Sequence, residues 1–173
     1  MLIRNALSAE ILRFAQDDNT ITPMKIIPIT NAVSEIIERE WLVQSETVHR
    51  QLRPHLPADY MGRMKQVFKS GAEMAVAVND SHVLGLTVYR MLEKTFNGRD
   101  LYCDDLVTDE SRRSTGVGKM LMQYMEKLAI ERGCDTFSLD SGCQRQQAHQ
   151  FYFREGMTID SFHFAKTLKK TAI

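Results

Sequence analysis

The sequence has few cysteines, and none of them stands at the spacing of a zinc-binding or redox pair. Cys103, Cys134 and Cys143 are the three cysteines of the chain, far apart and without a CxxC pair. Their odd number and spacing argue against both a metal site and a disulfide framework. A reducing, cytoplasmic setting without a metal is therefore expected.

Long apolar runs and an excess of charge are also missing. The longest uninterrupted apolar stretch is Met74 to Val78, far short of the roughly 20 residues that a membrane helix needs. Lys and Arg number 22, as do Asp and Glu, so the formal net charge is zero. Nucleic-acid-binding domains usually carry a basic excess. The sequence thus predicts neither a membrane span nor a nucleic-acid partner.

A chain of 173 residues with 43% hydrophobic and 25% charged residues has the size and composition of one globular domain. Pro23 closes a short amphipathic segment, and Met24 opens an apolar strand pattern. We therefore expect a single domain over residues 24–173, preceded by an N-terminal extension over residues 1–23. The alternative for the extension is a docking helix or a partner-binding arm.

Hydrophobic periodicity predicts helices and strands in alternation, with Asn97-Gly98 as a strong hairpin signal. The order β-α-α-β-β-β-α-β-α-β indicates a mixed sheet with helices on its faces, in the α/β or α+β class. The expected elements are a strand over 24–29, helices over 31–51 and 58–68, strands over 74–78, 83–92 and 101–108, a helix over 116–132, a strand over 136–139, a helix over 146–155 and a last strand or strand pair over 157–168.

Two glycines, Gly116 and Gly118, open the helix that follows the third hairpin strand. Unpaired N–H groups and the positive end of the helix dipole make such a start an anion site. Arg112, Arg113 and Lys119 add positive charge. The pattern predicts a phosphate-bearing ligand, while the alternative is an ordinary turn flanked by solvated charges.

Two common phosphate motifs fail at this turn. A P-loop needs glycine five residues before the glycine of its Gly-Lys pair and Ser or Thr after the lysine. Arg113 and Met120 hold those positions. A dinucleotide fingerprint needs a third small residue, where this chain has Leu121. A nucleotide-binding switch protein is therefore disfavoured.

The pattern R-x-x-G-x-G over residues 113–118 does match, between a strand and an amphipathic helix. Downstream, residues 148–157 read Ala-His-Gln-Phe-Tyr-Phe-Arg-Glu-Gly-Met, and the strand end Leu139-Asp140-Ser141-Gly142 lies between the two motifs. This combination resembles the GNAT superfamily of N-acetyltransferases, whose first motif binds the acetyl-CoA pyrophosphate and whose second reads A-x-x-F-Y-x-x-x-G-F. The resemblance implies a mostly antiparallel mixed sheet flanked by helices.

The resemblance also implies direct transfer of an acetyl group from acetyl-CoA to an amine, without an acyl-enzyme. The strand before the loop would splay from its neighbour and bind the pantetheine arm, and the loop would bind the pyrophosphate. Arg145 stands where many members have an Asn that contacts the CoA arm. The implied cofactor-binding residues are Leu106, Val107, Thr108, Arg112, Arg113, Ser114, Thr115, Gly116, Val117, Gly118, Lys119 and Arg145.

Three residues match the catalytic positions of that family. Tyr152 would be the general acid that protonates the CoA thiolate, because a phenol stays protonated at neutral pH. Asp104 and Asp105 are candidate bases for the acceptor amine, and strand alternation would point one toward each face. We favour Asp105; the alternative is that both carboxylates only cap the hairpin.

For the acceptor we expect a small-molecule amine or a peptide N-terminus. The family sets this choice with the first two helices, here roughly residues 41–68, which contain Trp41, His49, His55, Asp59 and Tyr60. Asp104, Asp105 and Asp140 would make the acceptor mouth negative. The alternative function is a non-catalytic acetyl-CoA sensor. A homodimer that pairs through late strands, around Phe162 and Phe164, is a further expectation.

Overall fold

The computed structural model describes residues 23–168, and the chain divides into two compact units, residues 1–139 and 140–173. The expected N-terminal extension lies outside the described residues apart from Pro23. The extent of the domain therefore stays a prediction. No helix within residues 23–168 is long and apolar enough to cross a bilayer.

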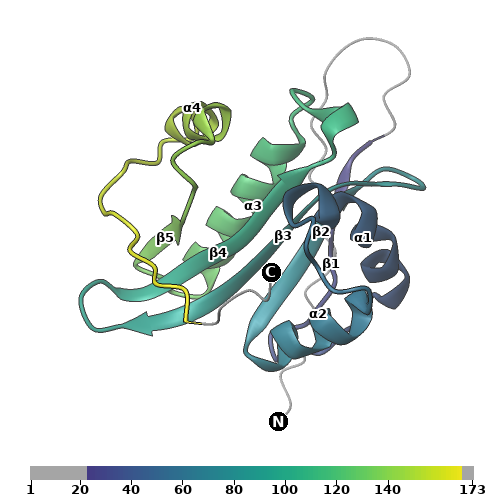
Figure 1. The fold of residues 1–173 in the computed structure, drawn as a ribbon, viewed down its shortest axis with the longest axis horizontal. Helices are drawn as coiled ribbons and strands as arrows, with labels where there is room; N and C mark the ends of the chain where they lie inside the picture. The colour runs from purple at the N-terminus through teal and green to yellow at the C-terminus, as the bar shows by residue number, and fades with distance from the viewer. Residues whose placement is uncertain (1–22, 169–173) are drawn as a thin grey trace. The chain divides into compact units, whose positions relative to one another are not determined.

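The first unit contains a five-stranded sheet in the order β1-β2-β3-β4-β5, antiparallel except for the parallel pair β4–β5 (Figure 1). The mixed, mostly antiparallel sheet flanked by helices is confirmed. The elements of this unit are β1 (Lys25–Pro28), α1 (Arg39–Leu52), α2 (Tyr60–Lys69), β2 (Ala72–Val78), β3 (Val83–Lys94), β4 (Gly98–Thr108), a 3-10 turn (Glu110–Arg112), α3 (Val117–Glu131) and β5 (Thr136–Leu139). The second unit holds α4 (Gln146–Arg154).

Helices cover both faces of the sheet in the first unit, with α1 and α2 on one face and α3 on the other (Figure 1). On the α1–α2 face, Leu42 and Met64 pack with Met74 and Leu86 of the sheet. On the α3 face, Val117, at the first turn of the helix, and Leu121 pack with Ala77 and Leu84 of the sheet. The sheet is thus buried between two layers of helix, and α3 begins against its surface.

The expected helix over residues 31–51 begins later, at Arg39. Asn31 caps a turn instead of a helix, because its side-chain oxygen accepts from the N–H groups of Val33 and Glu35 at 3.1 and 2.9 Å. Ser34 has a φ of 61°, which breaks a right-handed helix. The helix start that the spacing of Val33 and Ile36 predicts is therefore wrong, because these residues lie in the turn before α1.

The expected last strand or strand pair over residues 157–168 is wrong for the described structure, which has no strand after α4. Phe162 and Phe164 are 84% and 91% exposed, so their alternation does not mark a buried face. Period-two alternation favours a strand only where a neighbouring strand supplies hydrogen bonds. Within residues 140–168 no such neighbour is present.

Gly85 of β3 lets α3 approach the sheet closely. A Cβ placed there would lie 2.7 Å from Val117 Cγ1 and 2.8 Å from the backbone oxygen of Val107. The backbone oxygen cannot rotate away as a side chain would. The close approach of α3 therefore depends on the missing side chain.

Gly85→Ala is expected to lower the free energy of unfolding by about 1–3 kcal/mol, the usual cost of overpacking. Urea unfolding at unchanged m-value measures this loss. The control Lys65→Ala, at an exposed position of α2, should stay within about 0.5 kcal/mol of wild type. Equal stability of both variants would contradict the proposed close packing.

Candidate active site

Strand β4 loses one of its two neighbours halfway along its length. Its pairs with β3 run from Gly98 to Thr108, whereas its pairs with β5 cover only Asp100 to Cys103. The edge of β4 over residues 104–108 therefore has no strand partner on the β5 side within the first unit. Leu106, Val107 and Thr108, the residues expected to bind a pantetheine arm, lie on this unpaired edge.

A β-bulge lies where the two strands part. Val88 pairs with Asp105 and Tyr89 with Cys103, so Asp104 is an extra residue on β4. The Asp105 carboxylate bonds His49 of α1, and the Asp104 carboxylate bonds Arg90, which shares the face of Val88. The expectation that these carboxylates point to opposite faces is wrong, because the bulge interrupts strand alternation.

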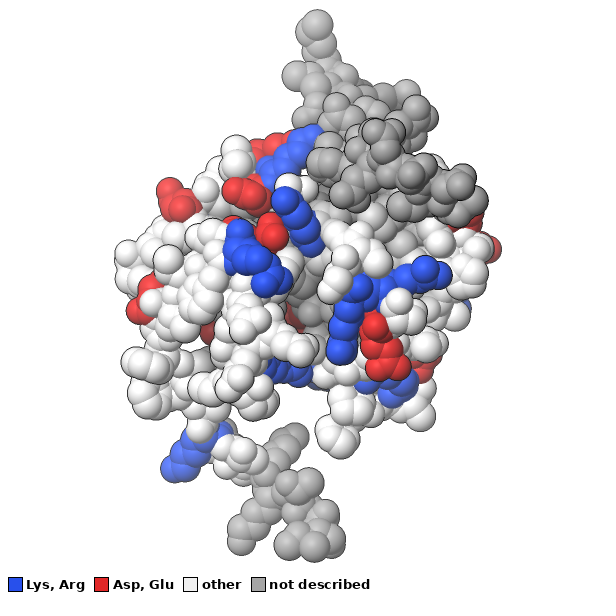
Figure 2. Space-filling model, turned by 90° about the horizontal axis from the view of Figure 1, so that it is seen from above, with Lys and Arg blue, Asp and Glu red and all other residues white. Residues whose placement is uncertain are grey.

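Each carboxylate of the bulge is paired with an arginine. Arg53, at the end of α1, donates to Asp105 at 2.6 Å and also to the backbone oxygen of Asp104 at 3.1 Å. Arg90 of β3 donates to Asp104 at 2.7 Å. The charge of each of these two carboxylates is therefore offset by a guanidinium, and the negative acceptor mouth, which also involves Asp140 of the second unit, stays a prediction. Figure 2 likewise shows basic and acidic side chains intermixed on the face that it views.

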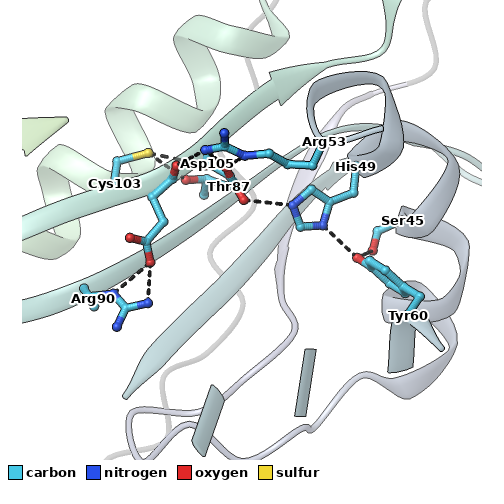
Figure 3. Close-up of polar contacts among 9 residues, drawn as sticks. Ser45, His49, Arg53, Tyr60, Thr87, Arg90, Cys103 and Asp105 are labelled. Atoms are coloured by element: carbon cyan, nitrogen blue, oxygen red, sulfur yellow. Dashed lines mark hydrogen bonds and ion pairs between the residues drawn. The ribbon is translucent and has the colours of Figure 1, made fainter. Parts of the chain in front are cut away.

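A buried chain of hydrogen bonds leads from α2 to the bulge (Figure 3). The Tyr60 hydroxyl lies 3.1 Å from Ser45 Oγ and 3.0 Å from His49 Nδ1, and His49 Nε2 lies 2.9 Å from Asp105 Oδ2. His49 is 2% exposed and Ser45 is fully buried. The sequence associates His49 and Tyr60 only with acceptor choice, and it does not reveal their link to Asp105.

The sequence of α1 contains a pattern that indicates this chain of hydrogen bonds. Leu42, Ser45, Val48 and His49 recur at helical spacing, and all four are buried. Two polar residues on an apolar helix stripe need buried partners, since an unpaired polar group in the core is costly. The identity of the partner on β4 could not be read from that spacing.

The surroundings of the bulge shift two pKa values upward. Desolvation raises the pKa of Asp104, and the hydrogen bond and charge of Arg90 oppose that rise. Burial raises the pKa of the Cys103 thiol to about 12. Cys103 therefore stays protonated and is not a nucleophile at neutral pH. Asp104, in contrast, binds a proton more readily than an exposed aspartate does.

The loop between β4 and α3 ends at backbone N–H groups that are not hydrogen-bonded within the described residues. Gly116 caps α3 at a φ of 89°, with no side-chain hydrogen bond, and a methyl group added to it would meet no atom within 4 Å. Within residues 23–168, the N–H groups of Val117, Gly118 and Lys119 have no hydrogen-bond partner. An anion can therefore approach these groups closely.

The other expected phosphate-binding residues surround this start of α3. Arg112, Arg113, Ser114 and Thr115 are exposed, and Thr115 donates its hydroxyl to the Arg112 backbone oxygen at 2.6 Å. None of the three cations, Arg112, Arg113 and Lys119, forms an ion pair within the part of the chain that the structure describes. The structure thus gathers the expected loop residues at one exposed helix start.

Upstream, Asp109 anchors the loop. Its carboxylate accepts from the backbone N–H of Ser111 at 2.8 Å and from Gln51 of α1 at 3.4 Å. The hydrogen bonds from Ser111 lower the pKa of Asp109. Gln51 also accepts from the N–H of Glu110 at 2.9 Å. These contacts tie the beginning of the loop to the end of α1.

The remaining expected residues belong to the second unit. Tyr152 lies on α4 and is half-buried, with its ring centroid 5.5 Å from that of Phe151. Arg145 is the exposed residue before the first turn of α4. Two other residues of this unit, for which no role is expected, are His149, which contacts the backbone oxygen of Gly142 at 3.1 Å, and the exposed Cys143. The roles expected for Tyr152 and Arg145 stay predictions.

Arg90→Met is expected to raise the pKa of Asp104 further, because it removes two contributions that lower it and leaves the desolvation. A pH titration followed by the ¹³C shift of the Asp104 carboxyl group measures the change. Arg99→Met, which removes a cation that pairs with Glu93 instead, is the control and should leave Asp104 unchanged.

The same change has a stability readout. A raised folded-state pKa means that the stability contributed by Asp104 is present at low pH and is lost as pH rises through that pKa. The stability deficit of Arg90→Met relative to wild type should therefore shrink on acidification. A pKa that falls, or a deficit that grows toward acid pH, would contradict the assigned pairing of Asp104 with Arg90.

Comparisons with known proteins agree with this architecture. The sequence model of the acetyltransferase (GNAT) family matches residues 31–157. The uncharacterized N-acetyltransferase YhdJ of Bacillus subtilis is 30% identical over 137 residues, which cover 78% of this chain and 96% of that protein.

Solved structures share the fold at low sequence identity. The aminoglycoside N-acetyltransferase AAC(6')-Iy in complex with CoA gives a TM-score of 0.70 at 16% identity, covering 84% of this chain and 95% of that one. An acetyltransferase of Trypanosoma brucei gives 0.68 at 18% identity, covering 84% and 99%. With its family match over most of the chain and its unpaired strand edge beside an open helix start, the chain belongs to the acetyltransferase (GNAT) family and is an acyltransferase.

Proposed function

We propose that the protein transfers the acetyl group of acetyl-CoA directly to a primary amine of a small molecule, with no acyl-enzyme. The observation that carries the proposal is the course of β4 after Cys103. The strand loses β5 as a partner there and leads into a loop that ends at the uncapped start of α3. An extended thioester arm and its diphosphate need these two features in this order.

The residues present fit acetyl-CoA. Leu106, Val107 and Thr108 are paired with β3 on one edge only, and their other edge offers hydrogen bonds to an amide-containing arm, as another strand would. The exposed N–H groups at the start of α3 and the neighbouring arginines suit a diphosphate. Acetyl-CoA supplies the acetyl group as a thioester, and Arg145 is a further candidate for phosphate binding.

For the proton transfers we assign Asp104 as base and Tyr152 as acid. An alkylamine is protonated near neutral pH and must lose a proton before it attacks a carbonyl. Asp104 is more exposed than Asp105, and desolvation raises the pKa of Asp104, so it accepts a proton more readily than an exposed aspartate does. Asp105 is already bound by His49 and Arg53. Tyr152 would donate a proton to the leaving thiolate.

The acceptor class rests on the relatives. The structurally similar AAC(6')-Iy and meta-AAC0020 are aminoglycoside acetyltransferases, and the latter was solved with sisomicin. A short match of 33% identity over 64 residues is to an aminoalkylphosphonate N-acetyltransferase of Salmonella typhimurium, covering 37% of this chain and 42% of that protein. We propose a small-molecule amine, in a cytoplasmic setting; a peptide acceptor and a homodimer are separate predictions.

Acetyl-CoA and CoA are expected to raise the melting temperature, by an amount equivalent to about 2.7 kcal/mol at a hundred times Kd, while NAD and ATP leave it unchanged. Gly116→Val should weaken acetyl-CoA binding at least about tenfold, since a side chain would cover the exposed N–H groups.

Gly133→Val is a matched control for that variant. Gly133 lies at the other end of α3, also has a positive φ, 66°, and also has open space around it. It should reproduce any backbone strain without weakening the binding of acetyl-CoA. A wild-type protein stabilised by ATP and not by acetyl-CoA would overturn the proposed function.

Tyr152→Phe should lower kcat about 100-fold and leave the Kd of acetyl-CoA unchanged, because it removes the proposed acid and keeps the aromatic ring. Thiol release with a panel of small amines and a peptide measures kcat. Tyr124→Phe removes a hydroxyl that bonds Tyr89 on the α3 face and is the control. A sensor would bind acetyl-CoA and give no thiol release in wild type, which would favour the alternative function.

A further inference from the structure

We infer that His49 is a positioning residue, held as an imidazolium between Tyr60 and Asp105, which fixes the β4 bulge in the geometry that acetyl transfer needs. His49 donates no proton to the substrate in this inference. It acts through Asp105, and Asp105 acts on the backbone at Asp104. The inference rests on the proposed function and names residues that stabilise its reacting strand.

Counting hydrogen atoms along the chain gives the protonation of His49. The Leu42 backbone oxygen carries no hydrogen, so Ser45 Oγ must donate its only hydrogen in that 2.7 Å contact. At 3.1 Å from Tyr60, Ser45 then accepts, and the phenol donates its hydrogen to Ser45. Burial raises the pKa of Tyr60 to about 12, so the phenol keeps this hydrogen at neutral pH.

The two nitrogens of His49 are then both donors. Tyr60 has no hydrogen left, so its oxygen accepts from Nδ1–H at 3.0 Å. Asp105, which Arg53 also binds, is an ionised acceptor and takes Nε2–H at 2.9 Å. A neutral His49 would accept the Tyr60 hydrogen at Nδ1, and the 3.1 Å contact between Ser45 and Tyr60 would then have no hydrogen unless Ser45 gave up its 2.7 Å bond to Leu42. Only the imidazolium gives each of these four contacts a hydrogen, which favours the charged ring.

The same count excludes a proton relay. The chain ends at the backbone oxygen of Leu42, which cannot pass a proton on, and both Ser45 and Tyr60 are buried. A proton taken from the amine therefore has no exit along this path. These hydrogen bonds instead fix the orientation of the His49 ring and, through the ring, that of the Asp105 carboxylate.

Asp105 in turn fixes the bulge. Arg53 bridges its carboxylate and the backbone oxygen of Asp104, and Cys103 Sγ lies 3.3 Å from the Asp105 backbone oxygen. Contacts from the end of α1 and from within β4 thus hold the residues at which β4 leaves β5 (Figure 3). The backbone beyond this point is the part that would bind the acetyl thioester, so small shifts of the bulge should affect the reaction rate.

The charges around His49 support a cation there. The groups that face it are Asp105 from β4 and the neutral Tyr60 from α2. Around this pair lie Asp104, with Arg90 of β3, and Glu46, Arg50 and Arg53 of α1. The three positive charges of Arg50, Arg53 and Arg90 balance the three negative charges of Asp104, Asp105 and Glu46, so no net positive charge around the ring opposes the imidazolium.

The ring nitrogens test the protonation without any substrate. In ¹⁵N NMR at pH 7, both nitrogens of His49 should give similar shifts and carry slowly exchanging hydrogens, as an imidazolium shielded from water does. Two widely separated nitrogen shifts, the pattern of a neutral ring, would overturn the inference. This readout does not depend on the proposed acetyltransferase activity, so the two can fail separately.

Kinetics test the positioning role. His49→Leu should lower kcat about 100-fold and leave the KM for acetyl-CoA within about threefold, since displacement by about 1 Å costs that much in rate. His49→Gln keeps a donor toward Asp105 and should recover at least tenfold of the loss. A His49→Leu variant with wild-type kcat, or no recovery by His49→Gln, would contradict the inference.

Tyr60→Phe serves where His49→Leu does not fold. It removes one hydroxyl and should lower kcat about tenfold. Tyr89→Phe is the matched control: Tyr89 is equally buried and bonds Tyr124 on the other face. Equal loss of kcat in both variants would indicate a general packing effect and overturn the inference.

Discussion

The candidate site depends on the unequal pairing of β4. One edge of this strand is paired with β3 along its whole length, while the other is paired with β5 over only Asp100 to Cys103. A strand that is hydrogen-bonded along one edge is fixed in position and still offers the backbone hydrogen-bonding groups of its other edge to a ligand. The bulge at Asp104 marks the change, and the polar contacts of the site converge on it.

The polar contacts at the bulge illustrate why a partly buried charge needs several partners. Asp105 is 13% exposed, so its carboxylate loses much of its hydration, and both its oxygens are bonded by His49 and Arg53. Asp104 is more exposed and has one partner, Arg90, which does not fully offset its desolvation. The two neighbouring aspartates thus differ in burial and in their partners, although the sequence alone gives them the same chemistry.

The fold could largely be predicted from the sequence, because each central strand and helix has a clear period and a marked end. The start of α1 could not, since the turn at Asn31 and Ser34 depends on local hydrogen bonds and an unusual φ. The last strand failed because alternation carries no information about a partner strand. At the site, the loop before α3 was predictable from its glycines, whereas the bulge and the bond between His49 and Asp105, 56 residues apart, were not.

Pairing of both carboxylates also constrains how an acceptor can be chosen. A protonated amine that approaches Asp104 or Asp105 must compete with a guanidinium already in place, so attraction by net negative charge contributes little to its binding. Arg53 is 51% exposed and remains accessible beside the bulge. Under the proposed function, selection among amines would then depend on the shape and hydrogen bonding of the acceptor, and an acceptor with an anionic group would gain a partner in Arg53 that a simple alkylamine would not.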